Sequence, residues 1–232
     1  MSGDIYASLS GASAAMRQMD VLSQNISNAN TTGYKEMRVT FQLEGAGKGP
    51  LGQATAAATP ANPDFRDGGL ELDGNENHLA LQGEGFFVLQ AGENELLSRA
   101  GAFHRDSDGR LVNARGHQVM GEGGAIEIPV EESFKVTQEG VVIGSRSGEI
   151  SRLRIVESTN VEPLGGGLWR STGTMLPSDA NVVQGALERS NVDPLRAMVE
   201  LIEASRYFEA YQNAMQTSDE MDSNLNNAGG NS

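Results

Sequence analysis

The two ends of the chain have the apolar spacing of helices, and the stretch between them does not. Near the N-terminus, apolar residues recur at intervals of four, three, four and three at Ile5, Leu9, Ala12, Met16 and Met19. Near the C-terminus, similar helical spacing links Met198, Leu201, Phe208, Tyr211 and Met215. Such spacing is that of a narrow apolar seam that one helix presents to another. Seams at both extremities let the termini pair with each other and with neighbouring molecules, which suits a polymer subunit better than an enzyme.

Between these helices, short apolar runs are separated by Gly turns, which is typical of strands. The run Phe86–Leu89 is bounded by Gly85 and Gly92, and the pair Asp108-Gly109 is predicted to be the tip of a β-hairpin. We therefore predict an α+β fold. Its N- and C-terminal helices pack as a coiled-coil-like inner domain, and its central domain is mostly antiparallel β.

The same pattern divides the chain into three parts. Residues 1–43 and 185–232 form a discontinuous helical inner domain with an extended arm. Residues 44–69 are rich in Gly, Ala and Pro and are expected to be a linker or a long loop. Residues 70–184 form the central β domain. The second helix is predicted to start at Asp193-Pro194, because Asp caps helices and Pro is favoured at the first helical position.

Charge and composition exclude several classes of partner. The chain has 17 basic and 31 acidic residues and a net charge of −14, which disfavours nucleic acid and anionic membranes. It has no Cys, so disulfides and thiolate metal sites are excluded. No apolar run approaches the length of about 18 residues that a membrane span needs. The N-terminus lacks a basic region followed by an apolar core, so we expect no cleaved secretory signal.

Motifs that suggest chemistry have simpler explanations. Asp106-x-Asp108-Gly109 resembles the start of a calcium loop, but Arg110 and an apolar strand follow in place of further ligands, which favours the hairpin. Gly83-Glu-Gly85 lacks the third Gly and the helix of a phosphate loop. The three His residues are scattered, without the spacing of metal ligands. We expect no catalytic residues, no cofactor, no metal and no small-molecule substrate.

Three blocks in the right order resemble the bacterial flagellar rod and hook proteins. The first is Val21–Lys35, with an Asn25-x-x-Asn28 pair and then Thr31-x-Gly33-Tyr34-Lys35. The second is Leu81–Val88, followed by Arg99-x-Gly101-x-Phe103 and the residues up to Gly116. The third starts at Ser190-Asn191-Val192 and continues through Met198, Arg206–Glu209 and Met221. Within the family, Val119–Pro129 is similar to the proximal-rod members, and the distal-rod members are the alternative.

The resemblance implies a structural subunit of the flagellar basal-body rod, the hollow periplasmic shaft that transmits torque to the hook. Such proteins leave the cell through the flagellar type III export apparatus without signal cleavage. They polymerise helically with copies of themselves and with other proximal and distal rod proteins, and their terminal helices lie innermost. A secreted adhesin or coat subunit with coiled-coil ends is the alternative from another class, but the Asn-Thr-Gly-Tyr signature argues against it.

The expected subunit contacts lie on the helical seams and beside them. They are Leu9, Met16, Leu22, Ile26, Leu201, Arg206, Phe208, Glu209, Tyr211 and Met215. A structural bend is expected where the first helix ends, at Asn25, Asn28, Thr31, Gly33 and Tyr34. Gly33 is expected to adopt a conformation that a Cβ would oppose. If the bend is only an ordinary helix end, Gly33→Ala costs at most about 1 kcal/mol.

Overall fold

The computed structural model describes residues 2–44, 55–58 and 61–229, and side chains within 8–41, 61–218 and 220–221. It divides into two units. The helical unit comprises residues 1–28, 36–64 and 192–232, and the β unit comprises residues 29–35 and 65–191. In the expected linker, residues 45–54 and 59–60 lie outside the described residues. The three domain boundaries expected from the sequence stay a prediction.

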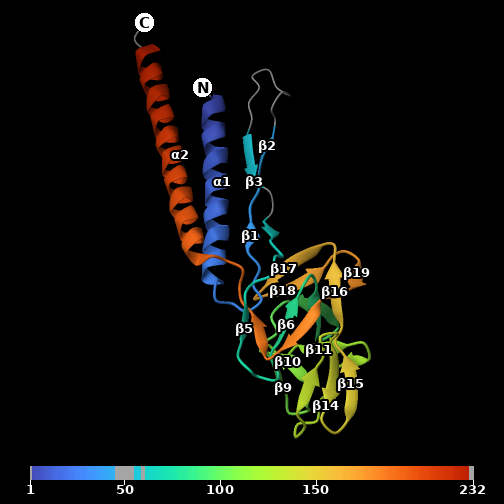
Figure 1. Ribbon diagram of the computed structural model, residues 1–232. Helices are drawn as coiled ribbons and strands as arrows, with labels where there is room; N and C mark the ends of the chain where they lie inside the picture. Colours follow the sequence, from blue (N-terminus) through green and yellow to red (C-terminus); the bar gives the residue numbers. More distant parts are fainter. Residues whose placement is uncertain (1, 45–54, 59–60, 230–232) are drawn as a thin grey trace. The chain divides into compact units, whose positions relative to one another are not determined.

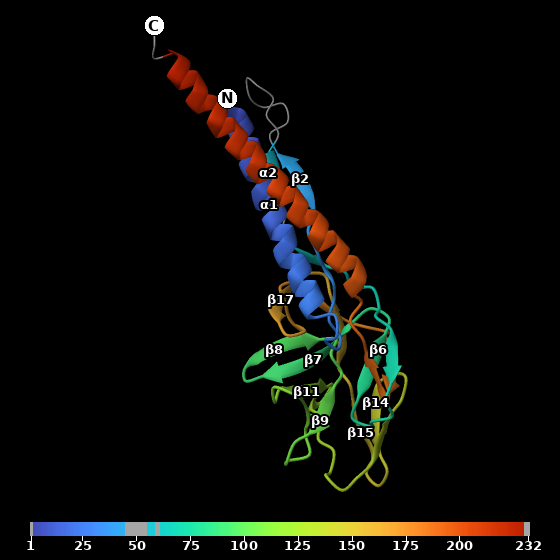
Figure 2. The ribbon, with the colours of Figure 1, turned by 90° about the vertical axis from the view of Figure 1, so that its left-hand side faces the viewer.

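The helical unit has two long helices and a two-stranded arm. Helix α1 spans Ser2–Ser27 and helix α2 spans Pro194–Gly229. The arm has two antiparallel pairs: β1 (Met37–Arg38) pairs with β4 (Asn62–Pro63), and β2 (Phe41–Glu44) pairs with β3 (Thr55–Ala58). Figures 1 and 2 show α1 and α2 side by side, with β3 next to α1.

The first turn of α2 is capped by a side chain, as the sequence predicts. The Asp193 Oδ1 atom accepts hydrogen bonds from the backbone N–H groups of Leu195 at 3.1 Å and Arg196 at 3.2 Å. Pro194 occupies the first helical position, where its missing N–H leaves no hydrogen bond unmade. The cap fixes where the chain turns into the helix.

The expected coiled-coil-like packing of α1 and α2 is wrong. Coiled coils insert large apolar side chains into holes on the partner, whereas Leu9 and Met16 of the expected seam are 53% and 52% exposed. Among the described side chains of the two helices, most of the buried apolar residues are small: Ala12, Ala14, Ala15 and Leu22 of α1, and Ala197 and Ala204 of α2. The helices therefore meet largely, though not entirely, through small side chains.

Gly11 shows how closely the two helices approach. A Cβ on Gly11 would lie 2.6 Å from the Cε1 and Cζ atoms of Tyr211 on α2, so the Tyr211 ring occupies the space that a side chain would need. A glycine inside a helix weakens it by about 1 kcal/mol relative to Ala. Here the glycine makes room for the partner helix.

The β unit is built from short antiparallel strands. They are β5 (Leu70–Leu72), β6 (Leu79–Gln82), β7 (Phe86–Ala91), β8 (Asn94–Ser98), β9 (Phe103–Arg105), β10 (Leu111–Asn113), β11 (Gln118–Gly121), β12 (Gly124–Ala125), β13 (Phe134–Val136), β14 (Val141–Gly144), β15 (Gly148–Arg152), β16 (Ile155–Ser158), β17 (Val161–Gly165), β18 (Leu168–Ser171), β19 (Met175–Pro177), β20 (Asn181–Gln184) and β21 (Ala186–Glu188).

The largest sheet of the unit has ten strands. Its main path runs β17-β18-β8-β7-β11-β10-β9, with β12 paired to β11, β16 paired to β7, and β19 paired to β16. Smaller sheets have the order β13-β14-β15, β20-β6 and β21-β5. Strands β9 and β10 form the hairpin that Asp108-Gly109 predicts, with Gly109 at a φ of +82°.

One apolar core lies inside the β unit. Its completely buried members include Leu79, Phe87, Leu89, Leu111 and Val119, which come from the four strands β6, β7, β10 and β11. The rings of Phe87 and Phe103 pack edge to face with centroids 5.2 Å apart. The unit thus has many large buried side chains, whereas among the described side chains of the two helices Leu22 is the one large apolar side chain that is buried.

This contrast predicts the order of proteolysis. We expect trypsin to cut the purified chain after Arg17 in α1 and Arg206 in α2 before it cuts after Arg99 or Arg105 in the β unit. Helices with few buried apolar contacts open readily, whereas strands over a packed core open only with global unfolding. Mass spectrometry of a digestion time course measures the order. Equal rates at the four sites would contradict the expectation.

Candidate functional site

The first part of the bend is fixed by an amide side chain that pairs with the backbone. Asn25, near the end of α1, is 1% exposed. Its Nδ2 donates to the Met37 carbonyl at 2.8 Å, and its Oδ1 accepts from the Met37 N–H at 2.9 Å. The side chain thus binds the backbone of β1 as a neighbouring strand would. Asn28 ends the helix by donating its Nδ2 to the Gln24 carbonyl at 2.8 Å.

The second part of the bend is packed into the β unit. Gly33 has a φ of +67°, as expected, and its N–H donates to the Glu188 carbonyl at 2.8 Å. A Cβ at Gly33 would lie 2.4 Å from the Ala100 nitrogen and 2.5 Å from the Arg99 carbonyl carbon. Thr31 accepts a hydrogen bond from the Tyr34 N–H at 3.2 Å, and the Tyr34 side chain is buried. Gly33 is therefore more than an ordinary helix end.

Lys35 follows directly and is completely buried. Its ammonium donates to Glu188 Oε1 at 2.6 Å, to the Arg66 carbonyl at 2.8 Å and to the Phe65 carbonyl at 3.4 Å. The side chains of Lys35 and Glu188 are both 0% exposed. Burial lowers the pKa of Lys35 from its ordinary value, and the nearby Glu188 carboxylate opposes this shift. Glu188 also accepts a hydrogen bond from the Gly68 N–H at 3.0 Å.

Arg99 is the third member of this group. Its side chain is 1% exposed, and its Nη1 lies 3.8 Å from Glu188 Oε2. Its Nη2 donates to the Gly83 carbonyl at 2.7 Å and to Asp67 Oδ1 at 3.1 Å. The guanidinium also lies over the Phe86 ring, 5.9 Å from its centroid. We call Lys35, Glu188, Arg99 and Asp67 the ion cluster.

No sequence pattern predicts a role for the members of the ion cluster. Lys35 and Arg99 occur in the motifs that carry the family resemblance, but Glu188 does not. The one signal for Glu188 was a carboxylate ending the otherwise apolar strand β21. A carboxylate in such a strand is rarely buried without a partner. The sequence could not identify that partner, because Lys35 lies 153 positions away.

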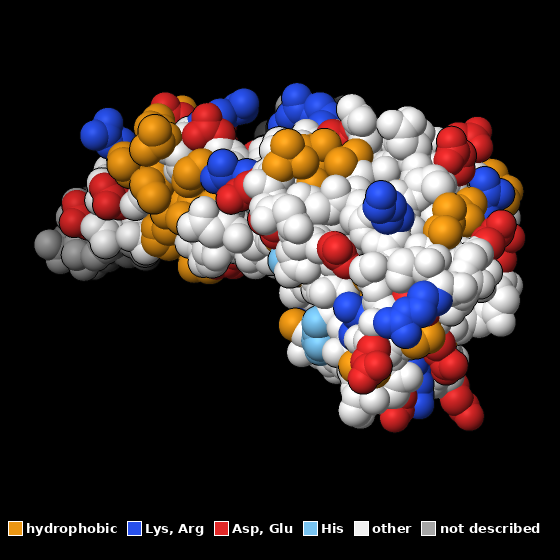
Figure 3. Space-filling model, turned by 60° about the horizontal axis from the view of Figure 1, so that its bottom comes forward, with side chains coloured by type: hydrophobic (Ala, Val, Ile, Leu, Met, Phe, Trp, Pro, Cys, Tyr) orange, Lys and Arg blue, Asp and Glu red, His pale blue; other side chains and the backbone are white. Residues whose placement is uncertain are grey.

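The outer surface of the helical unit carries exposed apolar side chains. On α2 these include Leu195, Met198, Val199 and Ile202, which are 75%, 46%, 56% and 56% exposed. Their spacing of three, four and seven residues from Leu195 places them on one face of the helix. Figure 3 shows apolar side chains, in orange, gathered over the helical unit at the left of that view. We call these four residues the α2 stripe.

The contact residues expected from the sequence have different environments. Five of them are exposed on the two helices: Leu9, Met16, Arg206, Glu209 and Tyr211. Tyr211 is the least exposed apolar residue of these, with 37% of its surface accessible. Four more are half-buried: Ile26, Leu201, Phe208 and Met215. Leu22 is already buried within the helical unit. The structure does not gather these residues on one face.

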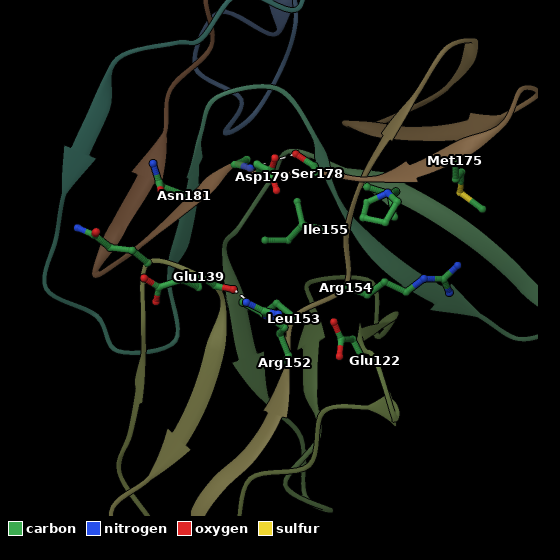
Figure 4. Close-up of a pocket in the computed structure, with 14 residues that line it drawn as sticks. Glu122, Glu139, Arg152, Leu153, Arg154, Ile155, Met175, Ser178, Asp179 and Asn181 are labelled. Carbon is green, nitrogen blue, oxygen red and sulfur yellow. Dashed lines mark hydrogen bonds between the residues drawn. The ribbon is translucent and has the colours of Figure 1, made fainter.

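A groove of about 560 Å³ lies in the β unit and is drawn in Figure 4. Acidic and basic side chains of Glu122, Glu139, Arg152 and Asp179 surround it. A hydrogen bond from Thr137 lowers the pKa of Glu139, so this carboxylate stays charged and is a poor proton donor at neutral pH. Among the described residues, no three His, Asp or Glu side chains are grouped to hold a metal ion.

Comparison with protein families matches the chain in three places. Residues 5–35 match the description "Flagella basal body rod protein", and residues 80–144 match "Flagellar hook protein FlgE/F/G D1 domain". Residues 183–228 match "Flagellar basal body rod FlgEFG protein C-terminal". None of the described helices is long and apolar enough to cross a membrane.

Similar proteins carry related names. The flagellar basal-body rod protein FlgF of Caulobacter vibrioides is 30% identical, and the alignment covers 95% of each chain. FlgG of Agrobacterium fabrum is 31% identical over 91% of this chain and 93% of its own. FlgG of Bacillus subtilis is 29% identical over 94% of this chain and 95% of its own.

The backbone overlap at Gly33 predicts a large loss of stability on substitution. We expect Gly33→Ala to lower the free energy of unfolding of the β unit by about 3 kcal/mol, because the new Cβ would overlap main-chain atoms that cannot rotate away. Urea denaturation followed by the fluorescence of Trp169 measures the loss. Trp169 is a suitable probe because it is buried and packs edge to face on Phe65 at 5.5 Å.

Gly92→Ala is the matched control. Gly92 has a φ of +62°, close to that of Gly33, but no atom lies within 4 Å of its ideal Cβ position. Its substitution measures the cost of the backbone conformation alone, about 1 kcal/mol. Equal losses of unfolding free energy in the two variants would show that the close approach of Gly33 to Arg99 and Ala100 does not contribute to the cost of the substitution.

Proposed function

The chain belongs to the flagellar basal-body rod protein family, and from this premise we propose that it is the proximal-rod member, FlgF. It is a structural subunit of the basal-body rod and not an enzyme. We further propose that it leaves the cell through the flagellar type III export apparatus and polymerises helically in the periplasm. Copies of the chain and other rod proteins would then form the shaft that transmits torque to the hook.

The lengths of the alignments support FlgF over FlgG. The alignment with Caulobacter FlgF runs over 236 positions, close to the 232 residues of the chain. The alignments with the FlgG proteins of Bacillus and Agrobacterium run over 252 and 251 positions, so this chain must be interrupted by more gaps to match them than to match Caulobacter FlgF. FlgG stays the second candidate because its identities of 29% and 31% are similar to the 30% of Caulobacter FlgF.

The observation that carries the proposed polymerisation is the α2 stripe. Ala197 and Ala204 of α2 are buried, whereas the larger apolar side chains of the stripe face away from them. Burial of each such side chain against a neighbour would contribute about 1.5–3 kcal/mol. Side chains of this size gathered on one helix face mark a protein contact, because soluble monomers rarely expose such patches. Helices of neighbouring rod subunits are the partner that we propose for the stripe.

The expected contact residues that are exposed would extend this surface. Leu9 and Met16 add apolar area on α1, and Arg206 and Glu209 add charges on α2 beyond the stripe. Exposed ion pairs contribute about 0–1 kcal/mol. The charges would therefore determine how helices of neighbouring subunits align along each other more than how tightly they bind. Because a rod subunit repeats around an axis, it must offer different surfaces to different neighbours. Two helices with several apolar faces meet that requirement.

A charge placed in the α2 stripe tests the polymerisation. We expect Ile202→Glu to abolish incorporation into rods and swimming, while the purified chain keeps its thermal midpoint, because Ile202 is 56% exposed in the subunit. Secretion should continue, since an unfolded chain in transit does not use a folded surface. Basal bodies isolated from a strain that carries the variant, probed with an antibody to the chain, provide the measurement.

Gln212→Glu is the control, because it adds the same charge at an exposed position of the same helix outside the stripe. It should leave swimming intact. Normal rod assembly by the Ile202→Glu variant would show that the α2 stripe is not part of the contact surface. Loss of secretion would instead identify α2 as an export element.

A further inference from the structure

The ion cluster lies where the chain enters and leaves the β unit. The division into units falls at residues 28/29, 35/36, 64/65 and 191/192, so the chain passes between them four times. Lys35 is the last residue of the β unit before one of these junctions. Its ammonium binds the carbonyls of Phe65 and Arg66, the first two residues after the next junction.

The fourth junction joins the same group. Asn191, the last residue of the β unit, donates its Nδ2 to the Arg66 carbonyl at 3.0 Å and its N–H to the Tyr34 carbonyl at 3.4 Å. The Arg66 carbonyl therefore accepts from both Lys35 and Asn191. The segment 29–35, which follows the first junction, is bound through the hydrogen bond from the Gly33 N–H to the Glu188 carbonyl.

We propose that the ion cluster is a positioning clamp: Lys35 and Glu188 fix the directions in which the chain leaves the β unit at the junctions 35/36 and 64/65, and rod assembly requires those directions. The Arg66 carbonyl, which Lys35 shares with Asn191, extends the clamp to the junction 191/192. Lys35 and Glu188 are thus positioning residues that touch no neighbouring subunit. The proposal rests on the proposed rod function, because assembly is the activity that the clamp serves.

The hydrogen bonds of Lys35 are specific in direction. An ammonium group has three hydrogens to donate, and Lys35 has three acceptors: one carboxylate oxygen and two backbone carbonyls. An apolar side chain of similar length would fill the same space but could not distinguish one backbone path from another. Glu188 adds a second backbone contact at Gly68, next to Asp67, which is bound by Arg99.

Stability alone does not explain why charged groups occupy this position. Removing two charges from water costs several kcal/mol for each ion, and apolar pairs of similar volume are often as stable or more stable. Removing one partner of a buried pair is different, because the remaining charge is left without compensation. A single substitution and a paired substitution therefore separate stability from positioning.

The test compares Lys35→Met with the double variant Lys35→Met/Glu188→Leu. We expect Lys35→Met to lower the thermal midpoint of the full chain by roughly 10 °C, because Glu188 stays buried and unpaired. The double variant should recover at least half of that loss and still fail to swim, since its apolar pair fills the space without binding the backbone of Phe65, Arg66 and Gly68. Each variant is expressed in a strain that lacks the gene, and thermal midpoint, secretion and rod incorporation are measured.

Glu132→Gln is the matched control. Glu132 is a buried carboxylate of the β unit that accepts hydrogen bonds from the Ser147 N–H at 2.7 Å and the Ser147 hydroxyl at 2.6 Å, and it also binds the Arg146 N–H. These bonds lie near strands β14 and β15 and involve no residue beside a junction. We expect Glu132→Gln to lower the thermal midpoint and to preserve swimming.

Two results would overturn the clamp. One is normal swimming by the double variant with its thermal midpoint recovered. If the midpoint is not recovered, Lys35→Met and Glu132→Gln are compared at equal secreted amounts, and equal loss of swimming in both also refutes the proposal. Failure of the wild-type chain to restore rods in the same strain would refute the rod function itself, so the two failures are distinguishable.

Discussion

The contact between Lys35 and Glu188 joins segments that are far apart in the sequence. Its 2.6 Å ion pair is completely buried, and the backbone groups around it belong to the chain on both sides of the arm. A charge in such a place requires partners with good geometry, because each unpaired ion costs several kcal/mol. The segments 29–35, 65–68 and 186–191 must therefore reach their final places together. The bend, the segment that follows the arm and the last strand of the β unit depend on this constraint.

Two uncharged residues, Asn25 and Gly33, also fix the backbone path of the bend. Asn25 pairs with both polar groups of the Met37 backbone, so the end of α1 is tied to the start of the arm within the helical unit. Gly33 lets the chain pass against the backbone of Arg99 and Ala100 within the β unit. An amide that imitates a peptide group and a residue without a Cβ both fix the backbone path directly. The signature that carries the family resemblance thus consists largely of residues that position the backbone.

Local features of the fold could be predicted from the sequence, because their causes are local. Asp193 caps α2, Asp108-Gly109 forms a hairpin, and Gly33 has a positive φ. The packing of the helices could not be predicted in the same way. A spacing of three and four residues shows which side chains share a face, but it does not show what that face contacts. Leu9 and Met16 share such a face and are exposed, while the smaller Ala12 and Ala15 are buried.

The pairing of side chains far apart in the sequence could not be predicted for a related reason. Nothing in the local pattern of Lys35 or Glu188 identifies the other residue as its partner. The fold places the segment of Lys35 beside β21 through the hydrogen bond from the Gly33 N–H to the Glu188 carbonyl at 2.8 Å. Arg99 lies in a motif that carries the family resemblance, but its role depends on Gly83 and on Asp67, which lies in the expected linker or long loop.

The distribution of apolar side chains in the helical unit suits a subunit that is completed by its neighbours. Most helical stability in proteins comes from tertiary packing of an apolar face. Here the buried side chains of α1 and α2 are mostly alanines, which bury little area, and larger ones such as Ile202 and Met198 are exposed. Assembly would therefore supply much of the packing energy of the helices, whereas the β unit has its own core of large side chains. With the proposed polymerisation, such a division would couple the order of the helices to assembly and would leave the β unit folded in either state.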